Sequence, residues 1–370
     1  MKQEIIRPRF AIGACELDEE GADGLRVIAV AQRLIEPIGC DDVGIVVARD
    51  AKGHPIFVLP LAIQQTGFAR ELTWLGSELC DYNAPLFAKD TASRLDAATF
   101  MSLWEQLIEQ LQADPRSRHD LIRLEKMPPM AGASRNPMLA LPTSLNPSGS
   151  YVTPLGQNWE EFYKAKRSST TRRRDRSKRS HLSESGEVKL VSAESADDAL
   201  ATLKILVEQK TASFARQGIG NIFARPGYLE FYQDIAGNPV ARDFVHISRL
   251  EVGKETAATN LGLVFAGSYY HVLASYTSGP LAHWGPGAAH LNDLLRYAIE
   301  RGLSVFDFTI GDERYKRDWC DDVQMLHDHV AVTSWRGALV AGPAMLRARV
   351  KRAIKQTPML WAMVEAPRTP

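Results

Sequence analysis

The segment Phe306–Cys320, FDFTIGDERYKRDWC, gathers most of the side chains that could do chemistry. It opens as an alternating apolar strand, and Gly311 then breaks the pattern. Beyond the glycine, Asp312, Tyr315 and Trp319 follow at spacings of three and four, which places them on one face of a helical turn. A carboxylate can accept a proton and a phenol can donate one, so this face could carry general acid–base chemistry.

Three more charged residues accompany this face. Lys316 shares it and could bind an anion, or could simply pair with Asp312 at i,i+4. Glu313 adds a second carboxylate. Asp307 lies inside the apolar strand, opposite its two phenylalanines, and a buried carboxylate needs a hydrogen-bond partner or a catalytic reason. Both interpretations of Asp307, structural and functional, stay open.

A short turn, Gly285-Pro286-Gly287-Ala288-Ala289, stands between an antiparallel strand region and a helix. Glycines ahead of a helix let the backbone approach a ligand closely, and the helix N-terminus offers unpaired N–H groups and the positive end of a dipole. This order predicts a site for a phosphate or pyrophosphate. The spelling matches neither GxGxxG nor a P-loop, so it does not indicate a dinucleotide or ATP. An ordinary turn before a helix is the alternative.

The block ASYTSGPLAHWGPGAAHLNDLLRYAIERGLSVFDFTIGDERYKRDW resembles the acetyltransferase family associated with bacterial cellulose and exopolysaccharide biosynthesis. That family belongs to the GNAT superfamily and is related to the Fem-type aminoacyltransferases. The resemblance covers most of the chain and is most specific from Phe244 to Trp319. In the first half, LCDYNAPLF (Leu79–Phe87) resembles the family's Asp-Tyr-Asn/Asp-x-Pro-Leu stretch. The resemblance implies an α/β (α+β) fold of two tandem GNAT-like halves, with mixed, mostly antiparallel sheets flanked by helices.

The resemblance also implies an acyl-coenzyme A donor and an amine or hydroxyl acceptor. The turn, with Trp284 before it and Lys316, would hold the phosphates of coenzyme A. Trp284 and Pro286 depart from the superfamily's usual Arg/Gln-x-x-Gly-x-Gly/Ala spelling. Tyr315 would be the acid that protonates the leaving thiolate, and the base or acceptor anchor would be one of the carboxylates Asp307, Asp312 and Glu313.

Substrate contacts are expected from Asp81, Tyr82, Asn83, His271 and Trp319. Two of these have plain alternatives. His271 could be a strand histidine with a local hydrogen bond, and Trp319 could be a core residue. No metal site is expected.

A basic stretch, KAKRSSTTRRRDRSKR, falls within a long polar helix expected over residues 159–182. Its nine cations face one acid, Asp175. A solvated face is the first interpretation, an anionic ligand such as coenzyme A the second, and RNA the third, because no aromatic residues are interleaved.

The chain of 370 residues balances 44 basic against 44 acidic side chains, so no global charge favours nucleic acid or membrane. Its four cysteines form no CxxC pair, which fits a reducing compartment. Neither a signal peptide nor an apolar span long enough for a bilayer is visible, so a cytoplasmic protein that is not integral to the membrane is expected. Three segments are expected: an N-terminal half over 1–150, a C-terminal half with the donor site over 151–335, and a helical tail over 336–370.

The sequence thus favours an acyl-coenzyme A-dependent N- or O-acyltransferase, of acetyl groups in the first instance. It would act on a small-molecule or saccharide acceptor, by direct attack on the thioester, and would not bind DNA. Two alternatives stay open: a Fem-type transferase that uses aminoacyl-tRNA, and a GNAT-like binding protein without turnover.

Overall fold

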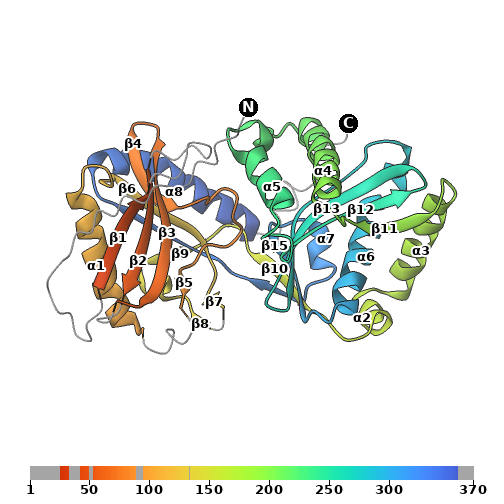
Figure 1. Ribbon diagram of the computed structural model, residues 1–370, viewed down its shortest axis with the longest axis horizontal. Coiled ribbons are helices and arrows are strands. Elements are labelled where there is room, and N and C mark those ends of the chain that lie inside the picture. Colours follow the sequence, from red (N-terminus) through yellow and green to blue (C-terminus); the bar gives the residue numbers. More distant parts are fainter. Residues whose placement is uncertain (1–25, 33–41, 50–52, 89–94, 133, 357–370) are drawn as a thin grey trace. The chain divides into compact units, whose positions relative to one another are not determined.

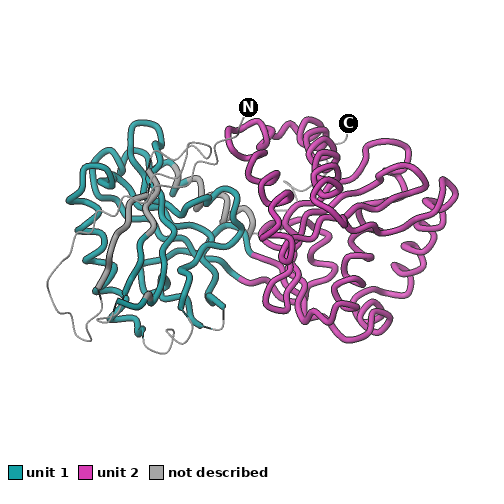
Figure 2. Tube along the Cα trace, viewed as in Figure 1, with its two compact units in different colours: residues 1–149, 325–370 teal, residues 150–324 magenta. Residues whose placement is uncertain are grey.

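The computed structural model describes residues 26–32, 42–49, 53–88, 95–132 and 134–356, and every structural statement below concerns these ranges. The chain forms two compact units, coloured separately in Figure 2. Unit 1 comprises residues 1–149 and 325–370, and unit 2 comprises residues 150–324. Residues 325–335 therefore group with unit 1, and not with the second half as the sequence suggested. The cause is a strand near the C-terminus that pairs with strands from the first half.

Unit 1 is built on a mixed sheet (Figure 1). The strand order is β1-β2-β3-β4-β6-β17-β9, and β5 pairs with β3. Helix α1 packs its apolar face on this sheet, and α8 lies against β4, β6 and β17. The elements are β1 (Arg26–Gln32), β2 (Asp42–Arg49), β3 (Pro55–Thr66), β4 (Ala69–Trp74), β5 (Leu86–Phe87), α1 (Ala97–Ala113), β6 (Leu121–Met127), β7 (Met130–Ala131), β8 (Ser134–Arg135), η1 (Pro137–Ala140), β9 (Thr143–Leu145), β17 (His327–Val332) and α8 (Trp335–Gln356).

Unit 2 has a sheet of similar design, in the order β11-β12-β13-β14-β15-β10-β16. The antiparallel strand region expected ahead of the glycine turn and the strand around Phe306 are both confirmed. The elements are β10 (Ser150–Pro154), α2 (Trp159–Lys166), α3 (Ser169–Ser183), β11 (Val188–Ser192), α4 (Ala196–Gln217), η2 (Ile222–Ala224), α5 (Tyr228–Gly237), β12 (Val245–Val252), β13 (Glu255–Phe265), β14 (Ser268–Tyr276), η3 (Pro280–Trp284), α6 (Pro286–Glu300), β15 (Val305–Ile310), α7 (Arg314–Arg317) and β16 (Asp322–Gln324).

The two sheets repeat one topology. In each, four antiparallel strands are followed by a helical crossover and a fifth strand parallel to the fourth: β4, α1 and β6 in unit 1, and β14, α6 and β15 in unit 2. The parallel pairing covers only three residues of each strand. Each fifth strand then holds a non-glycine residue at positive φ, Lys126 (61°) and Thr309 (60°). This confirms the expected α/β fold of two GNAT-like halves.

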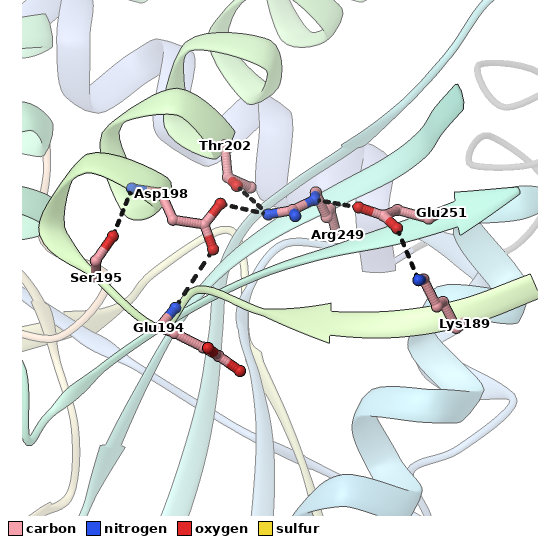
Figure 3. Close-up of polar contacts among 7 residues, drawn as sticks. All are labelled: Lys189, Glu194, Ser195, Asp198, Thr202, Arg249 and Glu251. Atoms are coloured by element: carbon pink, nitrogen blue, oxygen red, sulfur yellow. Dashed lines mark hydrogen bonds and ion pairs between the residues drawn. The ribbon is translucent and has the colours of Figure 1, made fainter. Parts of the chain in front are cut away.

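Helices α4 and α6 cover opposite faces of the unit 2 sheet (Figure 1). Neighbouring side chains of a strand point to opposite faces, and on β12 the Ser248 hydroxyl meets His290 of α6, whereas Arg249 reaches Asp198 of α4. Figure 3 shows the charged network that fixes α4. The guanidinium of Arg249 donates hydrogen bonds to Asp198 and to Glu251, both at 2.7 Å. Burial alone would lower the pKa of Arg249, but the two carboxylates outweigh it, and the pKa is raised.

The long polar helix expected over residues 159–182 is in fact two helices. Helix α2 ends at Lys166, and α3 starts at Ser169. Ser168 between them leaves the helical conformation (φ −58°, ψ 157°), and its hydroxyl accepts a hydrogen bond from the Thr171 N–H at 3.1 Å. Serine is a favoured N-cap, so the second helix begins where its first amides find an acceptor. None of the helices in the described ranges has the length and apolar character of a membrane span.

Candidate active site

Helix α6 begins at the Gly-Pro-Gly turn, and its first turn has no side-chain cap. Gly285 takes the left-handed conformation (φ 65°), which favours glycine. Pro286 has no N–H, and the amides of Ala288 and Ala289 both donate to the Gly285 carbonyl at 3.1 Å. The N–H of Gly287 donates to no acceptor in the described part of the chain. The turn therefore offers one free amide and the positive end of a helix dipole to an anion.

Two side chains flank this turn. A Cβ on Gly287 would stand 2.9 Å from Cδ1 of Tyr276, so the ring of Tyr276 lies directly on the glycine. On the other side, Nζ of Lys178 lies 3.6 Å from the position that a Cβ would take on Gly285. An ammonium from the basic helix α3 therefore stands next to the N-terminus of α6, where it adds to the positive potential.

Strands β14 and β15 separate on the way to this turn. Their parallel pairing ends at Tyr270 and Asp307, while β14 continues to Tyr276. Just beyond the pair of Tyr270 and Asp307, β14 contains a β-bulge, in which Val272 is the extra residue without a partner on β13. Ligands of open α/β sheets bind outside the carboxyl ends of strands, and bulges are enriched next to active sites.

The carboxyl end of β15 is held by charged groups. Asp307 is buried, and its Oδ1 accepts the N–H of Thr309 at 2.7 Å. Lys316 is buried as well, and its Nζ donates to the carbonyls of Thr309 (3.4 Å) and Ile310 (2.9 Å). Glu313 pairs with this ammonium at 2.9 Å and is itself largely exposed. Thr309 is β-branched at positive φ, so the backbone here is strained.

Tyr315 stands beside this strand end, on the short helix α7. The face expected from its spacing is divided, because Tyr315 is 39% exposed whereas Lys316 and Trp319 are buried. Its ring meets the edge of Phe308 at 6.3 Å. Desolvation raises the pKa of Tyr315 above its ordinary value of 10.0, and the negative charge of Glu313 raises it further. The phenol is therefore protonated near neutral pH.

His271 lies inside the sheet near the same strand end. Its carbonyl accepts the Thr309 hydroxyl at 3.4 Å, and its ring packs near Phe306 and Phe308. Burial lowers the pKa of His271 to about 3, with Lys316 and Lys210 adding to the effect. The imidazole is therefore neutral at pH 7 and is a weak base.

These observations bring Asp307, Glu313, Tyr315, Lys316 and His271 to the end of one strand, downstream of an uncapped helix N-terminus. Residues 169–317 match the family described as "Acetyltransferase (GNAT) domain". Unit 2 thus contains a region that matches a GNAT acetyltransferase domain. The match supports the GNAT part of the resemblance and the expectation of an acyltransferase.

Solved structures share the fold of this chain at low sequence identity. FemX aligns with a TM-score of 0.51 and 12% identity over 78% of this chain and 88% of its own. A C-terminal domain from Agrobacterium fabrum, described as that of a lysylphosphatidylglycerol synthetase, aligns with a TM-score of 0.50 and 10% identity over 82% and 88%. A conserved protein of unknown function from Bacteroides thetaiotaomicron aligns with a TM-score of 0.50 and 11% identity, over 80% of this chain and 87% of its own. No curated protein sequence is a significant match.

Trp319 of unit 2 is enclosed by other side chains. Its ring stacks on Phe162 at 6.1 Å, with 5° between the planes, and on Tyr163 at 6.1 Å. The guanidinium of Arg167 lies 5.0 Å from its centre. Trp319 therefore lies in the core of unit 2, which was the alternative to a substrate contact in the sequence analysis.

The stretch Asp81, Tyr82 and Asn83 lies in unit 1, outside the GNAT domain match. Asn83 is buried, and its backbone and side chain bond to the carbonyls of Lys126 and Glu125. Nζ of Lys126 donates to the carbonyls of Ser77 and Cys80, both at 2.8 Å. These bonds attach the loop after β4 to the end of β6, at the strained Lys126.

Two lysines that sequence reasoning missed are close to the site. Lys178 flanks the turn, but in the sequence nothing distinguishes it from the other cations of the basic stretch. Lys210 of α4 donates to the Ala274 carbonyl of β14 at 3.2 Å. Burial lowers its pKa, which the Glu313 carboxylate partly counteracts. A lysine inside an otherwise amphipathic helix was the available signal, but its strand partner is 64 residues away.

Proposed function

We propose that this protein is an acyl-coenzyme A-dependent acyltransferase that moves an acetyl or related acyl group to an amine or hydroxyl, with a saccharide as the favoured class of acceptor. The link to polysaccharide synthesis rests on the sequence resemblance alone. The uncapped N-terminus of α6, at the end of two separating strands, carries the donor part of the proposal.

The equivalent helix of unit 1 supports the choice of unit 2 as the donor site. Helix α1 is capped by Asp96, whose carboxylate accepts a hydrogen bond from the Thr99 N–H at 2.7 Å. The backbone hydrogen bond from Thr99 lowers the pKa of Asp96, so this carboxylate is ionised and would repel a phosphate. Helix α6 carries no acid in its first turn and has Lys178 beside it.

The chemistry assigned to the site is proton transfer by Tyr315 and a carboxylate. The protonated phenol of Tyr315 gives its proton to the thiolate as the carbon–sulfur bond breaks. Glu313 or Asp312 accepts the proton of the attacking amine or hydroxyl, directly or through water. Asp307 and Lys316 position the strand end that carries Thr309, and Trp319 supports α7 from the core. His271 provides a neutral wall.

Direct transfer to the acceptor is favoured over a covalent enzyme intermediate. Cys320 is the cysteine nearest the site in sequence, and burial raises the pKa of its thiol to about 12. A thiol of that pKa is almost entirely protonated at pH 7, and the thiolate is the nucleophile.

A Fem-type transfer from aminoacyl-tRNA is the second candidate. The fold shared with FemX and the basic side chains of α3 favour it. It differs from the first candidate in its donor, so a donor-binding measurement separates them. A protein that binds coenzyme A without turnover would show donor binding and no thiol release.

Ala288→Asp tests the proposed donor site. An aspartate in the first helical turn suits the helix dipole, so folding is retained, whereas its carboxylate repels a pyrophosphate. Ala288→Asn is the matched neutral control. Calorimetric titration with coenzyme A should show at least tenfold weaker binding for Ala288→Asp than for Ala288→Asn. Equal binding by both variants would remove the proposed site. Thiol release from acetyl-coenzyme A with a panel of amines and amino sugars then tests turnover.

A further inference from the structure

A cavity of about 200 Å³ lies between helices α3 and α6, on the flank of α6 that starts at the glycine turn. It is smaller than the roughly 300–1,000 Å³ of sites that enclose a drug-sized ligand, so it suits one end of a ligand. Gly285, Ala288 and Ala289 line it together with four basic residues of α3, and Trp159 and Trp284 form part of its wall. The cavity is therefore continuous with the proposed pyrophosphate site.

Each carboxylate that lines the cavity already has a partner. Asp293 accepts two hydrogen bonds from Nη1 of Arg179, at 2.9 and 3.0 Å. Glu160 lies 3.9 Å from Arg296. The third, Asp175, accepts the hydroxyl of Tyr163 at 2.8 Å and lies 3.7 Å from Arg167.

Three cations on the cavity wall have no such partner. Arg172, Arg176 and Lys178 make no ion pair with any residue that the structure describes. Nε of Arg172 is buried without a hydrogen-bond partner. A buried donor without an acceptor is costly, and a cavity with surplus positive charge is the place where an anion would supply that acceptor.

We propose that this cavity is a second phosphate subsite, in which Arg172, Arg176 and Lys178 bind the 3′-phosphate of the coenzyme A nucleotide. The inference rests on the proposed function. Coenzyme A carries a pyrophosphate and a separate 3′-phosphate on one adenosine, so two anion sites along one helix flank match its two charged groups. Guanidinium forks suit a phosphate dianion. The donor would then be selected by its 3′-phosphate.

The test compares coenzyme A with dephospho-coenzyme A, which lacks only the 3′-phosphate. Calorimetry on the full chain should show that wild type binds coenzyme A about tenfold more tightly. In Arg176→Gln/Lys178→Gln this ratio falls to about one. The control Arg173→Gln/Arg174→Gln removes two exposed charges of the same helix that do not line the cavity, and it keeps the wild-type ratio.

The ratio separates the subsite from the donor site itself. A wild-type ratio near one, or a ratio that the double variant leaves unchanged, overturns the subsite while the proposed function stands. Failure of wild type to bind either compound overturns both. Binding of uncharged tRNA that the double variant abolishes, with coenzyme A binding unaffected, assigns the three cations to RNA and also overturns the subsite.

Discussion

The ammonium of Lys316 donates a hydrogen bond to the carbonyl oxygen of Ile310 at 2.9 Å, so a buried charge binds the last residue of β15, the strand that leads into the candidate active site. The same ammonium reaches the Thr309 carbonyl and pairs with Glu313. A Cβ on Gly311 would stand 3.0 Å from this Nζ, which shows how closely the chain wraps around it. The sequence placed Lys316 among possible phosphate ligands, and its observed contacts give it a positioning role.

Replacing Lys316 with methionine should destabilise unit 2 by about 3 kcal/mol, because two strand-end carbonyls lose their donor and Glu313 loses its partner. Urea unfolding measures this change. Lys204→Met, at an exposed position of α4, is the control and should change stability by less than about 0.5 kcal/mol. A loss for Lys316→Met no larger than that of the control would contradict the assigned role.

Removing the hydroxyl of Tyr315 should separate catalysis from binding. Tyr315→Phe keeps the ring against Phe308, so folding and coenzyme A affinity stay unchanged, while turnover falls by about 10²–10⁴. Steady-state kinetics with calorimetry checks both quantities. Tyr297→Phe, whose ring stacks on His246 away from the proposed chemistry, is the matched control. Undiminished turnover in Tyr315→Phe would clear Tyr315 of the acid role.

Buried histidines should make unit 2 sensitive to acid. Burial lowers the pKa of His246 to about 4, and that of His271 and His290 to about 3, from 6.5. Below pH 6.5 these histidines become protonated in the unfolded chain but stay neutral in the folded chain. Stability is therefore complete above pH 6.5 and falls as the pH drops toward 4. Near pH 5 the three groups together predict a slope of about 4 kcal/mol per pH unit.

Chemical unfolding between pH 7 and pH 4.5 measures that slope. His290→Gln should lower it by about 1.4 kcal/mol per pH unit, the contribution of one proton. His283→Gln, at an exposed position of η3, should leave it unchanged. A wild-type stability that is flat over this range would contradict the prediction.

Local patterns predicted much of the fold. The apolar stripes of α1 and α6 follow the helical period, and Gly218 ends α4 in the left-handed conformation that favours glycine. The break at Ser168 was missed because charged residues continue across it, and only its capping geometry marks the second helix.

The site was less accessible to sequence reasoning because its contacts are not local. The turn and the segment around Tyr315 stood out by composition. Lys210 and Lys178 did not, since their roles depend on partners from β14 and α6. The buried chain of bonds from Asn260 and His246 to the Tyr269 hydroxyl is likewise visible only after the strands pair. Spacing also cannot show that Tyr315 faces solvent while Lys316 turns inward.

The late position of β17 has a consequence for synthesis on the ribosome. Its segment, His327–Val332, lies between β6 and β9 in the sheet, yet it is translated after all of unit 2. Until it emerges, β9 has no neighbour in its sheet, and one side of β6 is left open. The nascent chain can thus complete its inserted unit first, and the unit that starts the polypeptide is the last to close.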